Sequence, residues 1–314
     1  MTVRNTHRVV VFTIFLAAAS AGLAADTGPQ HWPRFRGLDG TAAAAAPSVP
    51  VTWTDKDYHW KVTLPGTGHS SPAVWGDRVF LTCGKEETGE RIVCCVSARD
   101  GKLLWQREYP SKTYRFHKDN SYASASPAVD AERVYARWTV PEKITLRALT
   151  HDGAEVWDRD LGPFAGPHGS GASPVVWGDT VILGNDQLGE SFLIAVDAAT
   201  GKTRWKTPRP SGRVSYCTPC VYRGKGEKPQ LIFTSTAAGM TGVDPETGTI
   251  NWKLRWDYPS SERFVASPVV AGGLVFAVTG KGGRGLHGAA VRPGSPDGTR
   301  PPKLAYALGT PMFY

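Results

Sequence analysis

Residues 172–205 read ASPVVWGDTVILGNDQLGESFLIAVDAATGKTRW, and this stretch decides the fold. It predicts four short strands, at residues 173–176, 180–184, 191–198 and 202–205, separated by Gly/Asp turns and one polar loop. Apolar, β-branched runs between turn residues are typical of strands, and no window of the stretch has a helical period. The stretch therefore predicts a compact four-stranded unit.

The same order of features recurs along the chain every 45 to 55 residues. A Ser/Thr-Pro pair opens each unit, at Ser71-Pro72, Ser126-Pro127, Ser173-Pro174, Thr218-Pro219 and Ser267-Pro268. A turn precedes each last strand, at Asp100-Gly101, Asp152-Gly153, Thr200-Gly201, Thr247-Gly248 and Asp297-Gly298. A four-stranded unit with this period is typical of an all-β fold, the β-propeller, whose blades are arranged radially.

The end of the unit has a more specific pattern. Residues 195–205 fit Ala-x-Asp-x-x-x-Gly-Lys-x-x-Trp at every position, and residues 242–252 fit it with two changes. In this respect the chain resembles the PQQ-like (pyrroloquinoline-quinone, quinoprotein-type) β-propeller repeat proteins, over roughly residues 60–297. The resemblance implies the architecture, but a fold by itself implies no activity.

The N-terminus has the pattern of a signal peptide, at residues 1–24. Arg4, His7 and Arg8 precede an apolar run at residues 9–19, and small residues follow at 22–24. Such a run is too short to span a bilayer, so the pattern predicts export to the periplasm or secretion, with no transmembrane anchor after cleavage. The excess of positive charge, +8 for the whole chain, is spread over all units and indicates no nucleic-acid partner.

Residues 25–59 are predicted to form an irregular strap, and residues 60–314 the partial propeller. In the strap, Trp32 and Phe35 are expected to pack onto the propeller. Residues 60–64 resemble a fourth strand that arrives before any first strand, and we expect it to complete the last blade, as N-terminal strands do in closed propellers.

The C-terminal part predicts an incomplete ring. Unit five becomes Gly/Pro-rich beyond residue 278, with Tyr306 in the place of the Trp, and residues 310–312 resemble the start of a sixth unit. Five recognisable blades are fewer than the six to eight that we expect in intact relatives, so the chain is interpreted as a truncated member. A closed ring of five blades is the alternative.

The recurring tryptophans are predicted to be structural. Each lies on an outer strand, where its indole can pack against the neighbouring blade and bury about 150–250 Å². The residues assigned this docking role are Trp60, Trp105, Trp157, Trp205 and Trp252.

Binding residues are expected at one end of the propeller. In an up-and-down blade, the loop before the first strand and the loop between the second and third strands lie at the same end, which we call the mouth. The predicted binding face consists of His69, His117, Asn120, Tyr122, His168, Ser170, Asn185, Asp186, Tyr216, Arg263 and His287. The alternative is that these side chains only bond to neighbouring loops and line a wet channel.

The five cysteines, Cys83, Cys94, Cys95, Cys217 and Cys220, give no redox or metal motif. Cys217 and Cys220 have CxxC spacing but fall on a predicted first strand, where a small apolar role is expected. The adjacent Cys94 and Cys95 resemble the vicinal disulfide of PQQ alcohol dehydrogenases, but they align with mid-strand residues.

The sequence favours a non-catalytic, exported scaffold that binds a protein or glycan partner, without cofactor or metal. The resemblance also implies an alternative, a PQQ-dependent dehydrogenase with bound Ca²⁺, which would need a Glu/Asn/Asp set, a catalytic Asp and an aromatic floor. Asn185 and Asp186 form an acid–amide pair in a predicted mouth loop, and no matching Glu can be placed for the calcium set. A fragment without independent function is the third possibility.

Overall fold

The structure, a computed structural model, describes residues 31–44 and 50–309. The predicted signal peptide and the predicted start of a sixth unit lie outside the described residues, as do parts of the strap. The described part is all-β, apart from one 3-10 turn at Asp55–Asp57.

In the described residues, twenty strands form five antiparallel sheets of four, each in sequence order from the inner to the outer strand. Blade one is β1 (Ala73–Trp75), β2 (Arg78–Gly84), β3 (Arg91–Ser97) and β4 (Leu103–Tyr109). Blade two is β5 (Ala128–Val129), β6 (Arg133–Val140), β7 (Lys143–Thr150) and β8 (Glu155–Asp160). Blade three is β9 (Val175–Trp177), β10 (Thr180–Asn185), β11 (Ser191–Asp197) and β12 (Thr203–Arg209). Blade four is β13 (Cys220–Tyr222), β14 (Gln230–Ser235), β15 (Gly239–Val243) and β16 (Ile250–Leu254). Blade five is β17 (Val269–Ala271), β18 (Leu274–Lys281), β19 (Arg284–Arg292) and β20 (Lys303–Leu308).

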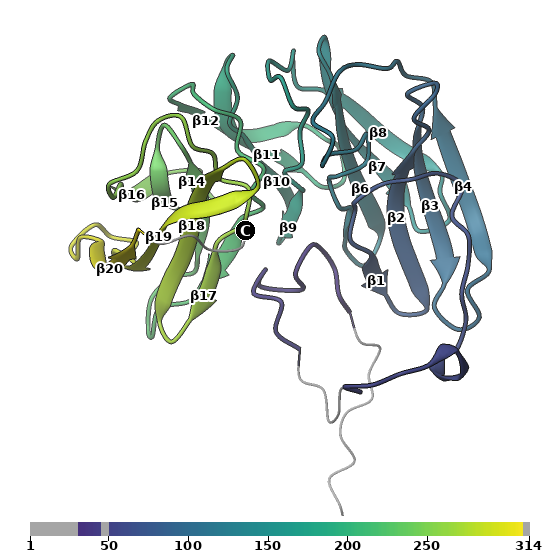
Figure 1. Cartoon of the computed structure of the whole chain (residues 1–314), viewed down its shortest axis with the longest axis horizontal. Helices are drawn as coiled ribbons and strands as arrows, with labels where there is room; N and C mark the ends of the chain where they lie inside the picture. Colours follow the sequence, from purple (N-terminus) through teal and green to yellow (C-terminus); the bar gives the residue numbers. More distant parts are fainter. Residues whose placement is uncertain (1–30, 45–49, 310–314) are drawn as a thin grey trace, which may run out of the picture.

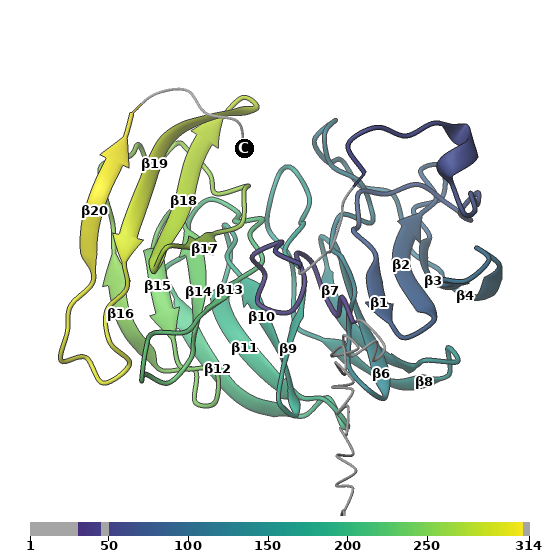
Figure 2. The same ribbon diagram turned by 90° about the horizontal axis from the view of Figure 1, so that it is seen from below.

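The five blades lie side by side along an arc that does not close (Figure 1). Blades one and five form its two ends, and the view from below shows the same separation (Figure 2). The prediction of a β-propeller with an incomplete ring is therefore confirmed, and the alternative of a closed five-bladed ring is wrong.

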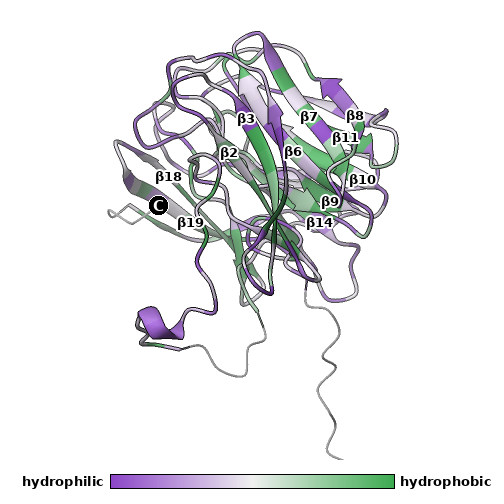
Figure 3. Cartoon of the chain, turned by 90° about the vertical axis from the view of Figure 1, so that its right-hand side faces the viewer, coloured by the Kyte–Doolittle hydropathy of each residue, from purple (hydrophilic) through white to green (hydrophobic). Residues whose placement is uncertain are grey.

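The core of the molecule lies between neighbouring blades. Four clusters of buried apolar side chains join blade one to two, two to three, three to four and four to five. The strands β9 and β10 are largely apolar, whereas the outer strand β8 is largely polar (Figure 3). All five cysteines are buried and none forms a disulfide. Cys217 donates to the carbonyl of Ala266 (3.0 Å) within the cluster between blades four and five.

The Ser/Thr of each Ser/Thr-Pro pair joins adjacent blades near the axis of the arc. The backbone N–H of this residue donates to the hydroxyl of its counterpart in the next blade, with donor–acceptor distances of 2.8 to 3.1 Å. The chain of bonds runs through Ser71, Ser126, Ser173, Thr218 and Ser267. Because these N–H groups are used between blades, the first strand of blade three begins at Val175 rather than at the predicted residue 173.

The indoles pack on the turn of the following blade. The Trp105 indole N–H donates to the carbonyl of His151 (2.7 Å), and that of Trp157 to the carbonyl of Ala198 (2.9 Å). A Cβ on Gly153 or Gly201 would lie 2.7 to 2.8 Å from these rings, so both turns need glycine for close approach as well as for a positive φ. Trp205 makes the same contact with the carbonyl of Pro245 (3.1 Å).

Blade five shows two variations on this packing. Trp252 lies under Gly294 of blade five, but its N–H donates to Gln230 Oε1 (3.0 Å) in its own sheet. Tyr306 pairs with Ala290 in the same register as Trp205 with Ala195, and it is 47% exposed. Although unit five is Gly/Pro-rich beyond residue 278, β19 and β20 complete its sheet, and Ala290 and Val291 are fully buried.

The N-terminal strand predicted at residues 60–64 is absent from the described part, and these residues join no sheet. Strand β20 already forms the outer edge of blade five. Trp60 instead packs at the other end of the arc, where its N–H donates to the carbonyl of Ala98 (2.9 Å) and its ring lies over Gly101. The docking contact is therefore present without a strand, because the indole needs only the turn of blade one.

Residues 31–40, which we call the plug, pass through the centre of the arc (Figure 2). Trp32 forms a β-bridge with Val74 of blade one, and the carbonyl of Pro33 accepts from Val129 of blade two. The buried Arg34 donates to the carbonyl of Pro219 (2.8 Å) at blade four. Inner strands that would otherwise face an open channel are thus bonded to one common segment.

Candidate functional site

One cavity of about 660 Å³ opens at the mouth of the arc. Its lining includes six residues of the predicted binding face, one or more from the loop before the first strand of every blade: His69, His117, Asn120, His168, Tyr216 and Arg263. The topological argument thus locates a real concavity, and the loops of all five blades contribute to it. Concave sites of this volume are the usual size for small-ligand binding.

The loops around the cavity are tied to one another by hydrogen bonds. The Asn120 side-chain amide donates to the carbonyl of His168 (2.6 Å), which joins the loops of blades two and three. The His117 and His168 rings meet edge to face, with their centroids 5.2 Å apart. Arg263 Nη2 lies 3.2 Å from His168 Nε2, which connects blade five across the mouth. The amide of Asn120 is therefore used in positioning the loops, while the ring edges of the histidines remain at the cavity.

Cationic groups dominate the electrostatics of the cavity. Arg36 and Arg263 both line it, and Asp119 is the one carboxylate among its lining residues. Burial lowers the pKa of His168, and the charges of the neighbouring Arg263, Arg213 and Arg115 lower it further. The part of this pKa shift that comes from the arginines indicates a positive local potential at the mouth.

Sequence reasoning missed the contribution of the plug. Phe35 and Arg36, at its tip, line the cavity. Arg36 Nη1 donates to the carbonyl of Ser267 (3.0 Å) and its guanidinium lies 5.3 Å from the centre of the Phe35 ring. Arg36 has a φ of +62°, one of two non-glycine residues with positive φ in the described part. The strap was expected to pack Phe35 against the propeller, and no pattern in the sequence indicates that its tip reaches the mouth.

Hydroxyl groups form part of the cavity lining. Ser173, Thr218 and Ser267 are more than nine-tenths buried, and each accepts a backbone N–H from the preceding blade. Within residues 31–44 and 50–309, no acceptor is recorded for the hydrogens of these three hydroxyls. A hydroxyl that accepts such a bond keeps its own hydrogen for donation.

Five residues of the predicted face lie outside the cavity lining, for three different reasons. The first reason is burial between blades. Tyr122 lies under the Arg91 guanidinium, 4.3 Å from ring centre to Cζ, and the Ser170 hydroxyl accepts from Arg137 (3.2 Å). Both were expected at the mouth because they are polar loop residues, but they are 8–9% exposed and bond to neighbouring blades.

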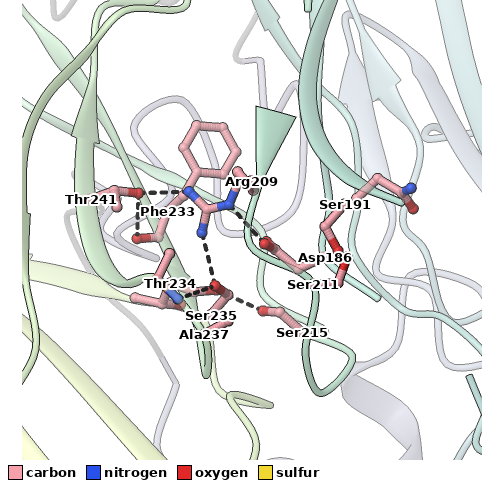
Figure 4. A network of polar contacts seen from close by, with 12 residues as sticks. Asp186, Ser191, Arg209, Ser211, Ser215, Phe233, Thr234, Ser235, Ala237 and Thr241 are labelled. Atoms are coloured by element: carbon pink, nitrogen blue, oxygen red, sulfur yellow. Dashed lines mark hydrogen bonds and ion pairs between the residues drawn. The ribbon is translucent and has the colours of Figure 1, made fainter. Parts of the chain in front are cut away.

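The second reason is pairing with buried arginines. Asn185, expected in a loop, ends β10, and its Oδ1 accepts from Arg137 (3.4 Å). Asp186 accepts from Arg209 Nε (2.7 Å), whose other nitrogens donate to Thr241 and Ser235 of blade four (Figure 4). The side chains of Asp186 and Arg209 are 6% and 0% exposed. This network bridges blades three and four and leaves neither residue at the mouth.

The third reason is a misplaced strand boundary. His287, expected in the loop between the second and third strands of unit five, lies within β19. Its Nδ1 is 2.9 Å from Glu262 Oε1, and the same carboxylate accepts from Thr279 (2.6 Å). The loop is only Gly282 and Gly283, because β18 and β19 continue to pair through Gly280 and Gly285 up to Lys281 and Arg284.

The residues present do not fit a PQQ site with bound Ca²⁺. Asn185 and Asp186, the pair proposed from the sequence for the calcium set, are committed to Arg137 and Arg209 in the interior. A cation placed there would meet two buried guanidinium groups. Among the residues that the structure describes, no group of three or more His, Cys, Asp or Glu side chains could hold a metal ion.

Comparison with known proteins identifies the family. The model of the family described as outer membrane protein assembly factor BamB matches residues 22–218, more than half of the chain. The chain belongs to this family. The BamB from Moraxella catarrhalis has a similar structure, with a TM-score of 0.54 at 17% identity over 80% of this chain and 64% of that one.

Quinoproteins are also similar to this BamB-family chain. The quinohemoprotein alcohol dehydrogenase from Comamonas testosteroni gives a TM-score of 0.61 at 13% identity, over 90% of this chain and 52% of that one. These solved structures share the fold alone. In sequence, polyvinylalcohol dehydrogenase from Pseudomonas sp is 25% identical over 262 residues, and that from Sphingopyxis sp. (strain 113P3) is 26% identical over 248.

The two polyvinylalcohol dehydrogenase alignments cover 70% and 62% of this BamB-family chain. The chain thereby spans only 38% and 35% of the length of these two relatives. In the described residues, no helix has the length and apolar character needed to cross a membrane.

Proposed function

We propose that this protein is a non-catalytic, exported β-propeller scaffold that binds a protein or glycan partner at its mouth. The observation that carries the proposal is the convergence of loop residues from all five blades, together with the tip of the plug, on one cavity of about 660 Å³. Binding residues concentrate on loops that a rigid scaffold positions. Membership of a family described as an outer membrane protein assembly factor supports a location outside the cytoplasm and a role in binding.

The alternative proposal is a PQQ-dependent dehydrogenase, which the similarity to polyvinylalcohol dehydrogenases favours. The commitment of Asn185 and Asp186 to buried arginines argues against it. We expect no tight binding of PQQ. Purified protein is titrated with PQQ and Ca²⁺, and quinone absorbance and alcohol-dependent dye reduction are followed. Micromolar binding with turnover would overturn the scaffold proposal.

The binding role is tested with the purified full-length chain on a defined glycan array and a defined peptide library. A double variant, His117→Ala with Arg263→Met, changes the mouth, and Arg99→Met changes an exposed cation on the turn between β3 and β4. We expect at least one ligand whose signal is lost in the double variant and kept in the control. Ligands that bind all three proteins equally would place binding elsewhere and contradict the proposal.

Export is tested on the expressed full-length chain by fractionation and N-terminal sequencing. The predicted outcome is a periplasmic or secreted protein that begins at about Ala25. An unprocessed chain in the cytoplasm would contradict this part of the proposal.

A further inference from the structure

The cavity at the mouth offers hydrogen-bond donors and positive charge, with few acceptors. Two guanidinium groups, Arg36 and Arg263, line it from opposite parts of the chain, the plug and blade five. The floor hydroxyls Ser173, Thr218 and Ser267 already accept a backbone N–H, so each has its own hydrogen to donate. A site composed largely of donors is suited to a ligand group that only accepts, such as a carboxylate.

The backbone at Arg36 is a second, independent observation. Its φ of +62° is in the left-handed region, which is unfavourable for a residue with a Cβ, and Gly37 beside it has a φ of +75°. Strained backbone persists where the surrounding structure fixes it, and it concentrates at functional sites. Arg36 lines the cavity in this backbone conformation, although glycine would satisfy the turn with less strain.

The rest of the lining indicates what carries the carboxylate. Aromatic residues, Phe35 and Tyr216, line the cavity together with the hydroxyls. An aromatic face can pack against the apolar face of a pyranose ring, while hydroxyl donors bond to its oxygens.

We propose that the mouth cavity binds an acidic sugar residue, a uronate, whose carboxylate is held by Arg36 and Arg263. This inference rests on the proposed binding function and specifies the ligand class of the same site. The carboxylate lies between the two guanidinium groups, and the sugar ring occupies the space between Phe35, Tyr216 and the floor hydroxyls.

Isothermal titration of the full-length mature chain with D-glucuronate tests the proposal, with D-glucose as the neutral analogue. We expect saturable binding of glucuronate, about tenfold or more tighter than glucose, and weakened by added salt. Arg36→Gly and Arg263→Met should each lower the affinity about tenfold. Arg99→Met, which removes a cation far along the surface of blade one, should leave it unchanged.

Arg36→Gly also separates binding from folding. Glycine adopts the observed φ of residue 36 without strain, so this variant should fold and melt like the parent while it loses glucuronate. An acidic hexapeptide and inorganic phosphate complete the titrations. Equal affinity for glucose and glucuronate, binding unaffected by both arginine variants, or phosphate binding as tight as glucuronate would each overturn the uronate proposal. If only the peptide binds at this cavity, the uronate proposal is overturned and the proposed binding function is kept. If no ligand binds on the array, in the library or in solution, both proposals are overturned.

Discussion

The two ends of the arc have the same sheet architecture but different surroundings. At blade one, the Trp60 ring covers the turn at Gly101, although residue 60 belongs to no strand. At blade five, β20 presents Leu304, Tyr306 and Leu308 on one side, and these side chains are 38% to 47% exposed. The difference teaches that an aromatic residue at this register is buried by the turn of a following blade and not by its own sheet.

The largest expected loss of stability comes from removing an indole that packs on the turn of a following blade. Trp205→Ala should lower the free energy of unfolding by about 3–5 kcal/mol, because it leaves a void against blade four and an unused carbonyl on Pro245. Tyr306→Ala, at the same register in blade five, should cost less than about 1 kcal/mol because the ring is already half exposed. Denaturant melts of both variants measure the difference, and equal losses would show that the ring of Tyr306 is covered in solution.

The turns themselves give a matched pair of glycines. Gly101 and Gly298 have nearly the same φ, +72° and +74°. A Cβ on Gly101 would lie 2.7 Å from the Trp60 ring, whereas a Cβ on Gly298 would meet open space. Gly298→Ala should therefore lower the free energy of unfolding by only about 1 kcal/mol, the cost of a Cβ at a positive φ. Gly101→Ala should lower it by about 2 kcal/mol or more, because the Cβ also clashes with the indole. Thermal melts of the two variants decide this, and a Gly101→Ala variant no worse than Gly298→Ala would mean that Trp60 is not docked.

The exposed side of β20 should promote self-association. Its outer edge has unpaired backbone groups next to three exposed apolar side chains, a combination that favours pairing with a second chain. We expect the weight-average mass in sedimentation or light scattering to rise with protein concentration. The double variant Leu304→Lys with Leu308→Lys should remain a monomer, because charge on an edge strand opposes pairing. A monodisperse monomer at all concentrations without substitution would contradict the expectation.

The smallest effect is expected at the mouth. His168→Ala should change stability by less than about 1 kcal/mol, since the side chain is half-buried and surrounded by solvent-exposed loops. The pKa of His168 is lowered in the folded state by burial and nearby cations, so the unfolded chain binds this proton more tightly. Stability should therefore fall slightly as the pH drops below about 6.5, and His168→Ala should flatten that slope. Melts at several pH values test this, and a slope that is unchanged in the variant would assign it to other groups.

Much of the fold could be predicted because its signals are local and repeated. A Gly with a positive φ, a Trp four residues later and an opening Ser/Thr-Pro recur in register, and strand alternation follows from the same residues. The boundaries were less accurate where hydrogen bonds between blades decide them, as at Ser173, or where pairing extends through glycines, as in β18 and β19. The prediction of a strand at residues 60–64 was wrong. The sequence shows that Trp60 resembles the tryptophan of a fourth strand, but it does not show that this indole packs on the turn of blade one.

The mouth was predicted in outline and missed in its decisive parts. Topology alone placed six loop residues at one cavity, since alternate connections of an up-and-down sheet lie at one end. Other predicted mouth residues are buried instead. Asn185 and Asp186 are polar residues next to a loop, but only the tertiary structure shows that they accept hydrogen bonds from Arg137 and Arg209.

The sequence by itself determined the blade, its turns, its docking aromatics and the end of the propeller at which the entry loops gather, because each depends on residues within one unit. Only the tertiary structure decided that the plug crosses the arc and that Arg36 lines the cavity beside Arg263, more than two hundred residues away. The tertiary structure also decided which polar side chains are buried and paired with arginines between the blades. The physical reason is that hydrogen bonds and charges act across space, so the partner of a side chain on an irregular segment has no periodic trace in the chain.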